Sequence, residues 1–207
     1  TGVNGAGKTT LFRCISGEED GYKGKIIVNG SHTIGYLPQD MNLLSEEPLL
    51  NYFKRETGIE LMTEEMKKTE AYFEKCGDND ELFKKMSDKY DRLLHNFTIR
   101  GGYSFDAHVQ KILNGLGFQK NDIRKKCSEF SGGWKMRIYL ARILLMRPDV
   151  MLLDEPTNHL DTESIEWLEQ YIRKYDGTMI AISHDRMFLD HCITATAELS
   201  NGKINKY

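Results

Sequence analysis

The chain has 207 residues, of which 40% are hydrophobic and 29% charged, and this is enough for one large domain with a buried core. Its formal net charge of -3 gives no basic footprint of the kind that nucleic-acid partners usually leave, and no apolar run approaches the roughly 18 residues of a membrane-spanning helix. Nothing at the N-terminus resembles a signal peptide, and the four cysteines are too far apart for a zinc site or a disulfide framework, so we expect reduced thiols, a cytoplasmic location and no direct membrane insertion.

The first ten residues fit the phosphate-loop pattern G-x-x-x-x-G-K-[ST], and a helix is predicted over 9–16. The glycines let the backbone bend so that successive N–H groups point inward, and the helix start turns its positive dipole end toward a bound anion. Lys8 is expected to reach the β- and γ-phosphates of a nucleotide, and Thr9 to ligate Mg²⁺. The predicted nucleotide-binding residues of this loop are Gly2, Asn4, Gly5, Ala6, Gly7, Lys8, Thr9 and Thr10.

A phosphate loop normally follows a buried strand, and here it begins the sequence, so we expect the chain to be a fragment of a longer protein. The preceding part would contain that strand and any aromatic residue that stacks on the nucleotide base. Two short strands are predicted next, over 25–28 and over 33–37, the second closed by Pro38. Gln39 follows the second strand directly, in a position suited to sensing the γ-phosphate.

Between about residues 46 and 100 the sequence is rich in Glu, Lys, Leu, Met and aromatic residues and shows no strand signal. Apolar residues recur at alternating steps of three and four from Met62 to Cys76 and from Leu82 to Phe97, with a turn over 77–80 between the two runs. We therefore expect an inserted antiparallel helical hairpin whose two apolar seams face each other.

After this insertion a helix is predicted over 105–116, then a basic link over 119–126, and then a helix that begins at the segment Ser131-Gly132-Gly133. A serine and two glycines at a helix start make a second N-terminus that can receive an anion. We expect 101–147 to form a helical subdomain.

An apolar run over 150–153 is typical of a fully buried strand of a parallel sheet, and it ends in Asp154 and Glu155. A magnesium-dependent nucleotide hydrolase needs such a pair, because Asp154 can hold Mg²⁺ while Glu155 orients and deprotonates the attacking water. The predicted metal ligands are Thr9, Gln39 and Asp154, and the predicted catalytic residues are Glu155, His184 and Gln39.

The remaining predicted elements are a helix with one apolar face from Ile165 to Tyr175, a buried strand over 178–183 with His184 at its tip, and a closing hairpin around Asn201-Gly202. Strands that alternate with helices and end in polar residues predict an open α/β sheet with its site at the strand tips.

Six segments resemble, in order, those of an ABC ATPase domain, a P-loop NTPase with a parallel-sheet core. They are Walker A at 2–9, Gln39, the signature Ser131-Gly132-Gly133, Walker B ending in Asp154-Glu155, the D-loop Asn158-His159-Leu160-Asp161, and His184. The string from Leu153 to Asp161, the segment Phe130 to Trp134, and the position of the hairpin are similar to the ABC-F family of soluble, twin-cassette translation factors. The resemblance implies that 1–207 is the first cassette of such a protein, truncated at its N-terminus, with 46–100 as its arm-like insertion and 101–147 as its signature subdomain.

The resemblance implies an ATPase with ATP and Mg²⁺ as cofactors. In that family two cassettes pair head to tail. Ser131, Gly132 and Gly133 would contact the nucleotide that the second cassette holds. The implied partners are that second cassette, the ribosome and transfer RNA. The parent protein could be a general translation factor, a ribosome-protecting antibiotic-resistance protein or a regulator, and the sequence leaves these open.

Two other functions compete with this one. The chain could be the nucleotide-binding subunit of an ABC membrane transporter, whose membrane segment is often on another chain, although the D-loop string and the hairpin argue against it. A DNA-repair or chromosome ATPase of the long coiled-coil class would need a far longer insertion between the phosphate loop and the signature.

Overall fold

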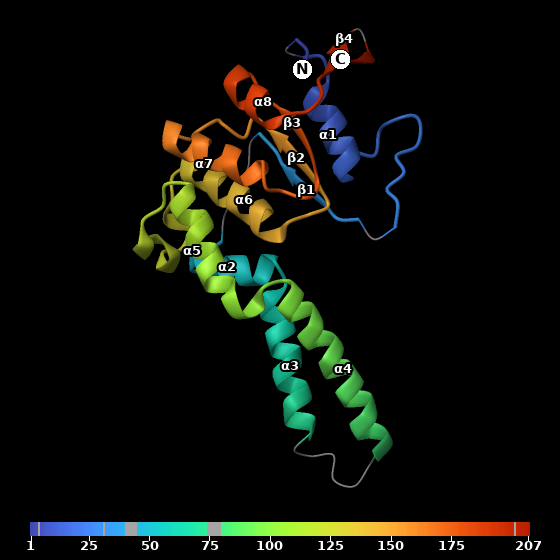
Figure 1. Cartoon of the computed structure of the whole chain (residues 1–207), viewed down its shortest axis with the longest axis vertical. Coiled ribbons are helices and arrows are strands. Elements are labelled where there is room, and N and C mark those ends of the chain that lie inside the picture. The colour runs from blue at the N-terminus through green and yellow to red at the C-terminus, as the bar shows by residue number, and fades with distance from the viewer. Residues whose placement is uncertain (4, 31, 40–44, 74–79, 201) are drawn as a thin grey trace.

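A three-stranded parallel sheet organises the body of the fold (Figure 1), in a computed structural model that describes residues 1–3, 5–30, 32–39, 45–73, 80–200 and 202–207. Its strands are β1 (Ile34–Leu37), β2 (Val150–Asp154) and β3 (Thr178–Ile182), with β2 in the middle. Leu152 lies opposite Tyr36 on one side and Ile180 on the other. Because the strands are parallel, their carboxyl ends lie along one edge, as the sequence predicted.

Helices cover both faces of this sheet, which explains why β2 is apolar throughout. On one face, Phe12 of α1 (Lys8–Ser16) packs with Tyr36 and Leu152. On the other, Met151 and Leu153 join the larger core of α6 (Gly132–Met146), since successive side chains of a strand point to opposite faces. A strand buried on both sides needs a continuous apolar run rather than an alternating one.

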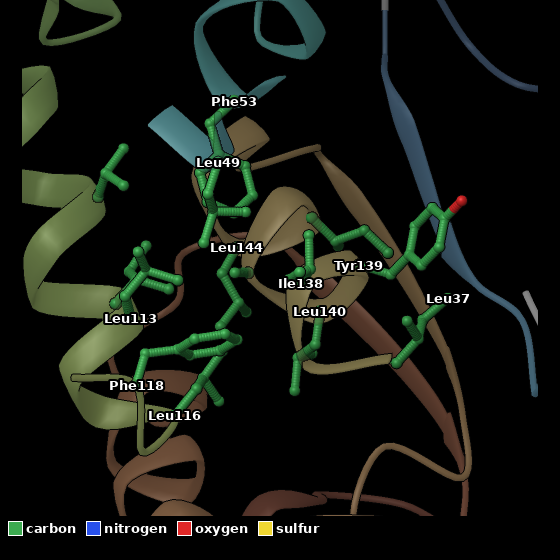
Figure 2. Close-up of a cluster of buried hydrophobic side chains, with 14 of the residues drawn as sticks. Leu37, Leu49, Phe53, Leu113, Leu116, Phe118, Ile138, Tyr139, Leu140 and Leu144 are labelled. Carbon is green, nitrogen blue, oxygen red and sulfur yellow. The ribbon is translucent and has the colours of Figure 1, made fainter. Parts of the chain in front are cut away.

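The larger core lies between the sheet and a helical layer, and Figure 2 shows part of it. Helices α2 (Leu49–Glu56), α5 (Phe105–Gly115) and α6 contribute to it. The short 3₁₀ turn η1 (Gly102–Ser104) precedes α5, and η2 (Lys120–Arg124) and η3 (Cys127–Glu129) lie between α5 and α6. Side chains from all three helices meet there, among them Phe53, Leu113 and Leu144, each fully buried. The sequence pattern does not separate helix α2, whose eight residues lie within the region 46–100 that predicts the inserted hairpin.

Helices α3 (Ile59–Phe73) and α4 (Asp80–Ile99) pack against each other and extend away from the body as a pair that we call the hairpin (Figure 1). Glu65 of α3 accepts from Lys89 of α4 at 2.7 Å, and the rings of Phe73 and Tyr90 meet edge-on at 6.0 Å. The two helices match the predicted apolar seams. Cys76 and most of the predicted turn over 77–80 lie outside the described residues. No helix in the described ranges is long and apolar enough to cross a membrane.

The C-terminal part adds α7 (Thr162–Ile172), α8 (Arg186–Cys192) and the antiparallel pair β4 (Ala197–Ser200) and β5 (Lys203–Lys206). Aspartates cap both helices: Asp161 accepts from the N–H of Ser164, and Asp185 from that of Phe188. The predicted hairpin is present, with residue 201 outside the described residues. Helix α8 was missed, although Asp185 before an apolar run is a helix-start signal.

The predicted strand over 25–28 is wrong. These residues have no regular secondary structure, and Ile27 is 79% exposed. A strand needs a neighbour to receive its backbone hydrogen bonds, and no described segment pairs with this one. The β-branched residues alone were therefore an insufficient signal.

Candidate nucleotide-binding and hydrolysis site

The phosphate loop bends at its glycines. Gly5 and Gly7 have φ of 79° and 95°, a conformation that residues with a Cβ rarely adopt. The N–H of Ala6 donates to the carbonyl of Val3 at 3.2 Å and closes a turn. A Cβ atom added at Gly5 or Gly7 would meet nothing within 4 Å, so the space beside the backbone is open to a phosphate group. The predicted residue Asn4 lies outside the described residues.

Lys8 is the first residue of α1, and its ammonium stays beside the loop. It donates to the carbonyl oxygens of Gly2 at 2.8 Å and Val3 at 3.1 Å. The backbone of Gly2 itself lies against β4, where an added Cβ would collide with the carbonyl oxygen of Leu199. An ammonium held by neutral carbonyl oxygens, beside the positive end of a helix dipole, is suited to phosphate. Thr10 is exposed on the first turn of α1.

Thr9 and Asp154 meet although 145 residues separate them: the Thr9 hydroxyl donates to a carboxylate oxygen of Asp154 at 2.6 Å. Asp154 is only 2% exposed. Burial raises the pKa of this carboxyl, and the Thr9 hydroxyl and the Lys8 charge act in the opposite direction. A hydroxyl and a carboxylate are the hard oxygen ligands that Mg²⁺ takes, so the two residues predicted to hold it fit that ion.

We predict that Asp154→Asn raises the thermal unfolding midpoint of the protein without nucleotide at neutral pH. A carboxyl with a raised folded-state pKa stabilises the fold while it is protonated, and this contribution is lost as pH rises through the folded pKa. A neutral amide removes the cost of burying the charged carboxylate at pH 7. Thermal scans from pH 7 to pH 4 should show the gain shrinking as the wild-type carboxyl protonates. Asp176→Asn, at a 97% exposed side chain, is the control. A lower midpoint for Asp154→Asn at pH 7 would contradict the prediction.

Glu155 follows Asp154 and is held by the end of the neighbouring strand. Its N–H donates to the carbonyl of Ile182 at 2.8 Å, and its φ is 51°, in the left-handed region. Its carboxylate accepts from the N–H of His184 at 3.2 Å, with the His184 ring nitrogen Nε2 at 3.5 Å. The side chain of Glu155 is 9% exposed and that of His184 67%. The two predicted catalytic residues therefore lie together at the edge of the sheet.

Gln39 is exposed and lines the same small cleft as Glu155, together with Pro156 and Asn158. The described part of the chain shows no hydrogen bond between Gln39 and either Thr9 or Asp154. Gln39 thus lies beside Glu155, and its roles as a catalytic residue and as a metal ligand both stay predictions.

The signature segment, Ser131-Gly132-Gly133, lies at the start of α6. Ser131 and Gly132 are exposed, and a Cβ added at Gly132 would meet nothing within 4 Å. A Cβ added at Gly133 would lie 3.4 Å from His159, so this glycine packs against the D-loop. The contacts of the described residues thus link the signature to the D-loop rather than to the phosphate loop, and its helix N-terminus stays open.

Arg137 makes this link, and the sequence did not predict it. Its guanidinium donates to the carbonyl of His159 at 2.8 Å and to Asp161 at 3.0 Å, and it stacks on the Trp134 ring at 4.6 Å. The backbone N–H of Ser164, with help from Arg137, lowers the pKa of the Asp161 carboxyl. The signal that could have found it is the aromatic residue three positions earlier on the same helix face.

Comparison with known proteins adds independent findings. The sequence profile of the family described as "ABC transporter" matches residues 1–158. The chain is 40% identical over 206 residues to "ABC transporter F family member 5" of Arabidopsis thaliana, which covers 97% of this chain and 29% of that protein. It is 34% identical over 202 residues to "Energy-dependent translational throttle protein EttA" of Escherichia coli (strain K12), which covers 98% of this chain and 36% of that protein.

Among solved structures, "Structure of ATP binding subunit of ABC transporter" matches with a TM-score of 0.70 at 18% identity, covering 100% of this chain and 76% of that one. This likeness confirms the fold class predicted from the sequence. The chain spans about a third of the length of the two curated relatives.

Proposed function

We propose that this chain, which belongs to the ABC transporter family of ATP-binding domains and to its ABC-F branch, binds and hydrolyses ATP as one of two cassettes of a protein that acts on the ribosome. ATP hydrolysis is the general activity of this family. The observation that carries the proposal is the meeting of the Thr9–Asp154 and Glu155–His184 contacts at the carboxyl edge of the sheet, beside the phosphate loop. A site of this make-up suits phosphate and Mg²⁺.

Binding would use the backbone of the loop first. The N–H groups around Gly5, Gly7 and Lys8 donate to phosphate oxygens, since no Cβ blocks the backbone at either glycine. Lys8 exchanges its two carbonyl partners, Gly2 and Val3, for the β- and γ-phosphates, whose oxygens carry more charge. Thr9 and Asp154 would hold Mg²⁺, which when bound neutralises phosphate charge.

Hydrolysis would use Glu155 as the general base. Its carboxylate is largely shielded from water, and the N–H of His184 fixes its orientation. Glu155 takes the proton of the attacking water, and the His184 ring, exposed beside it, donates to the γ-phosphate. Gln39, on the same cleft, orients that water.

The signature would act on a nucleotide other than the one at Lys8. Ser131 and Gly132 are exposed at an open helix N-terminus, so they are available to a second cassette. We infer that they cover the γ-phosphate held by that cassette and that 101–147 acts as the signature subdomain. Arg137 would keep the signature and the D-loop in register across the contact.

The ribosomal partner is supported by the Escherichia coli relative, whose name describes an energy-dependent translational throttle. The hairpin offers a contact element for ribosomal or transfer RNA, since Lys85, Lys89 and Arg92 follow one side of α4. Lys89 pairs with Glu65, so Lys85 and Arg92 are the stronger candidates for phosphate contacts. Such a partner would place the protein in the cytoplasm.

We predict that full-length Glu155→Gln protein co-sediments with ribosomes in ATP and that replacing 63–95 by a short Gly/Ser linker reduces this. A contact through two phosphates, at Lys85 and Arg92, should lose roughly 7- to 12-fold in affinity as salt rises from about 50 to about 200 mM. Nucleotide binding by the deletion variant controls for folding. Undiminished co-sedimentation would make the hairpin a structural element only, and absence of ribosome binding in every variant would favour the transporter alternative.

A further inference from the structure

The root of the hairpin is tied by backbone hydrogen bonds to the segment that precedes the signature. Leu49 donates its N–H to the carbonyl of Lys125 at 2.9 Å, and Cys127 donates to Glu47 at 3.1 Å. Ser128 donates to Ser45 at 3.0 Å. Residues 45–49 and 125–128 thus form a strap that ends three residues before Ser131. Helix α2, which begins within this strap, leads directly to the hairpin.

A side-chain contact joins the far end of α2 to the signature helix. Arg142 of α6 donates to the carboxylate of Glu56 at 2.9 Å, and both side chains are about one quarter exposed. The Arg142 guanidinium also stacks on the Tyr139 ring at 5.1 Å. Its Nε is buried and finds no hydrogen-bond partner among the described residues. The charge of Arg142 is therefore compensated chiefly by Glu56, which makes the contact sensitive to the exact place of α2.

Glu56 lies at the point where both ends of the hairpin come together. Arg100, just after α4, donates to the carbonyl of Thr57 at 3.0 Å. The Thr57 hydroxyl donates back to the carbonyl of Phe53, whose side chain is fully buried in the core. A displacement of the hairpin is therefore transmitted through Arg100 to Thr57, the residue next to Glu56.

We propose that Glu56 and Arg142 are positioning residues that fix the signature segment relative to the hairpin, so that whatever the hairpin binds controls ATP turnover at the site to which the signature contributes. Arg142 is eleven residues beyond Ser131, about 16 Å along a rigid helix, so a shift at the ion pair carries to the helix start. The site affected is the one whose phosphates the other cassette holds, not the one at Lys8. The inference rests on the proposed pairing of two cassettes.

Glu56→Gln in the full-length protein tests this, since it keeps the shape of the side chain and removes the charge. We expect amide hydrogen exchange in 131–138 to quicken roughly threefold to tenfold, the size of effect that weakening one charged hydrogen bond produces. The kcat for ATP should fall while the nucleotide affinity of the Lys8 site stays unchanged. Exchanging the partners, Glu56→Arg with Arg142→Glu, should restore part of the exchange protection of 131–138 and part of the kcat. Arg142→Lys, which keeps the charge and loses the planar fork, gives a milder version if either variant folds poorly.

Asp106→Asn is the matched control, because Lys54 and Asp106 form a 2.8 Å ion pair that also starts from α2 and ends on α5 instead of α6. Unchanged exchange and kcat in Glu56→Gln, or equal changes in the control, would overturn the proposal. A third outcome is that Glu56→Gln changes amide exchange and kcat, while ribosomes change the kcat of no variant. This outcome would keep the positioning role and reject the ribosomal partner.

Discussion

Replacing Glu155 with glutamine is expected to lower ATP turnover of the full-length protein by about 10²- to 10⁴-fold, because the change removes a general base. Binding of ATP should persist, since the glutamine oxygen can still accept from the N–H of His184 and the contact between Thr9 and Asp154 is untouched. Phosphate release measured at saturating ATP, beside equilibrium binding of a fluorescent ATP analogue, separates the two effects.

Glu166→Gln is the control for this experiment, because Glu166 is an exposed acid on α7. Its turnover should equal that of the wild type. Phosphate release by Glu155→Gln within a few-fold of the wild type would remove Glu155 from the role of base. Loss of ATP binding would instead mean that its carboxylate holds the loop between Asp154 and the D-loop in shape.

Replacing Lys8 with alanine is expected to weaken nucleotide binding by about 10²- to 10⁴-fold, since two charged hydrogen bonds to phosphate are lost at about 1.5–3 kcal/mol each. The fold should survive, because the carbonyl oxygens of Gly2 and Val3 lie near the surface and can bond to water instead. Isothermal titration with ATP and Mg²⁺ measures the loss, and thermal unfolding without nucleotide checks the fold.

Lys174→Ala removes an exposed lysine after α7 and should bind nucleotide as the wild type does. Equal affinities for Lys8→Ala and Lys174→Ala would show that the lysine is dispensable and that the backbone N–H groups carry phosphate binding alone. Lys8→Arg keeps the charge in a larger, planar group, so its affinity reports how closely the loop fits the ammonium.

Much of the fold was predictable because buried segments carry apolar residues with a spacing that depends on their secondary structure. The run 150–153 is apolar at every position since it is covered on both faces, and the hairpin seams recur with helical spacing. The strand predicted over 25–28 failed because pairing depends on a neighbour that composition does not reveal. Helix α2 was missed because its short apolar face merged with the longer pattern that follows.

The predicted site residues followed from motifs, whereas their geometry did not. Pattern and order pointed to Thr9 and Asp154, which are bonded in the structure. The orientation of Glu155 by His184 and the links made by Arg137 depend on backbone atoms that are distant in sequence. Backbone carbonyl and N–H groups are the same for every residue type, so a sequence carries no direct record of such contacts.

The backbone conformation at Glu155 opposes the stability of the fold to the presence of the catalytic carboxylate. A left-handed conformation costs a residue with a Cβ roughly 1–2 kcal/mol, a cost that glycine avoids and asparagine tolerates better. Selection for thermal resistance alone would therefore favour variants that discard this carboxylate. Laboratory evolution of a more thermostable cassette has to include a screen for phosphate release in every round. Without it, the selected variants will be well-folded proteins that no longer turn over ATP.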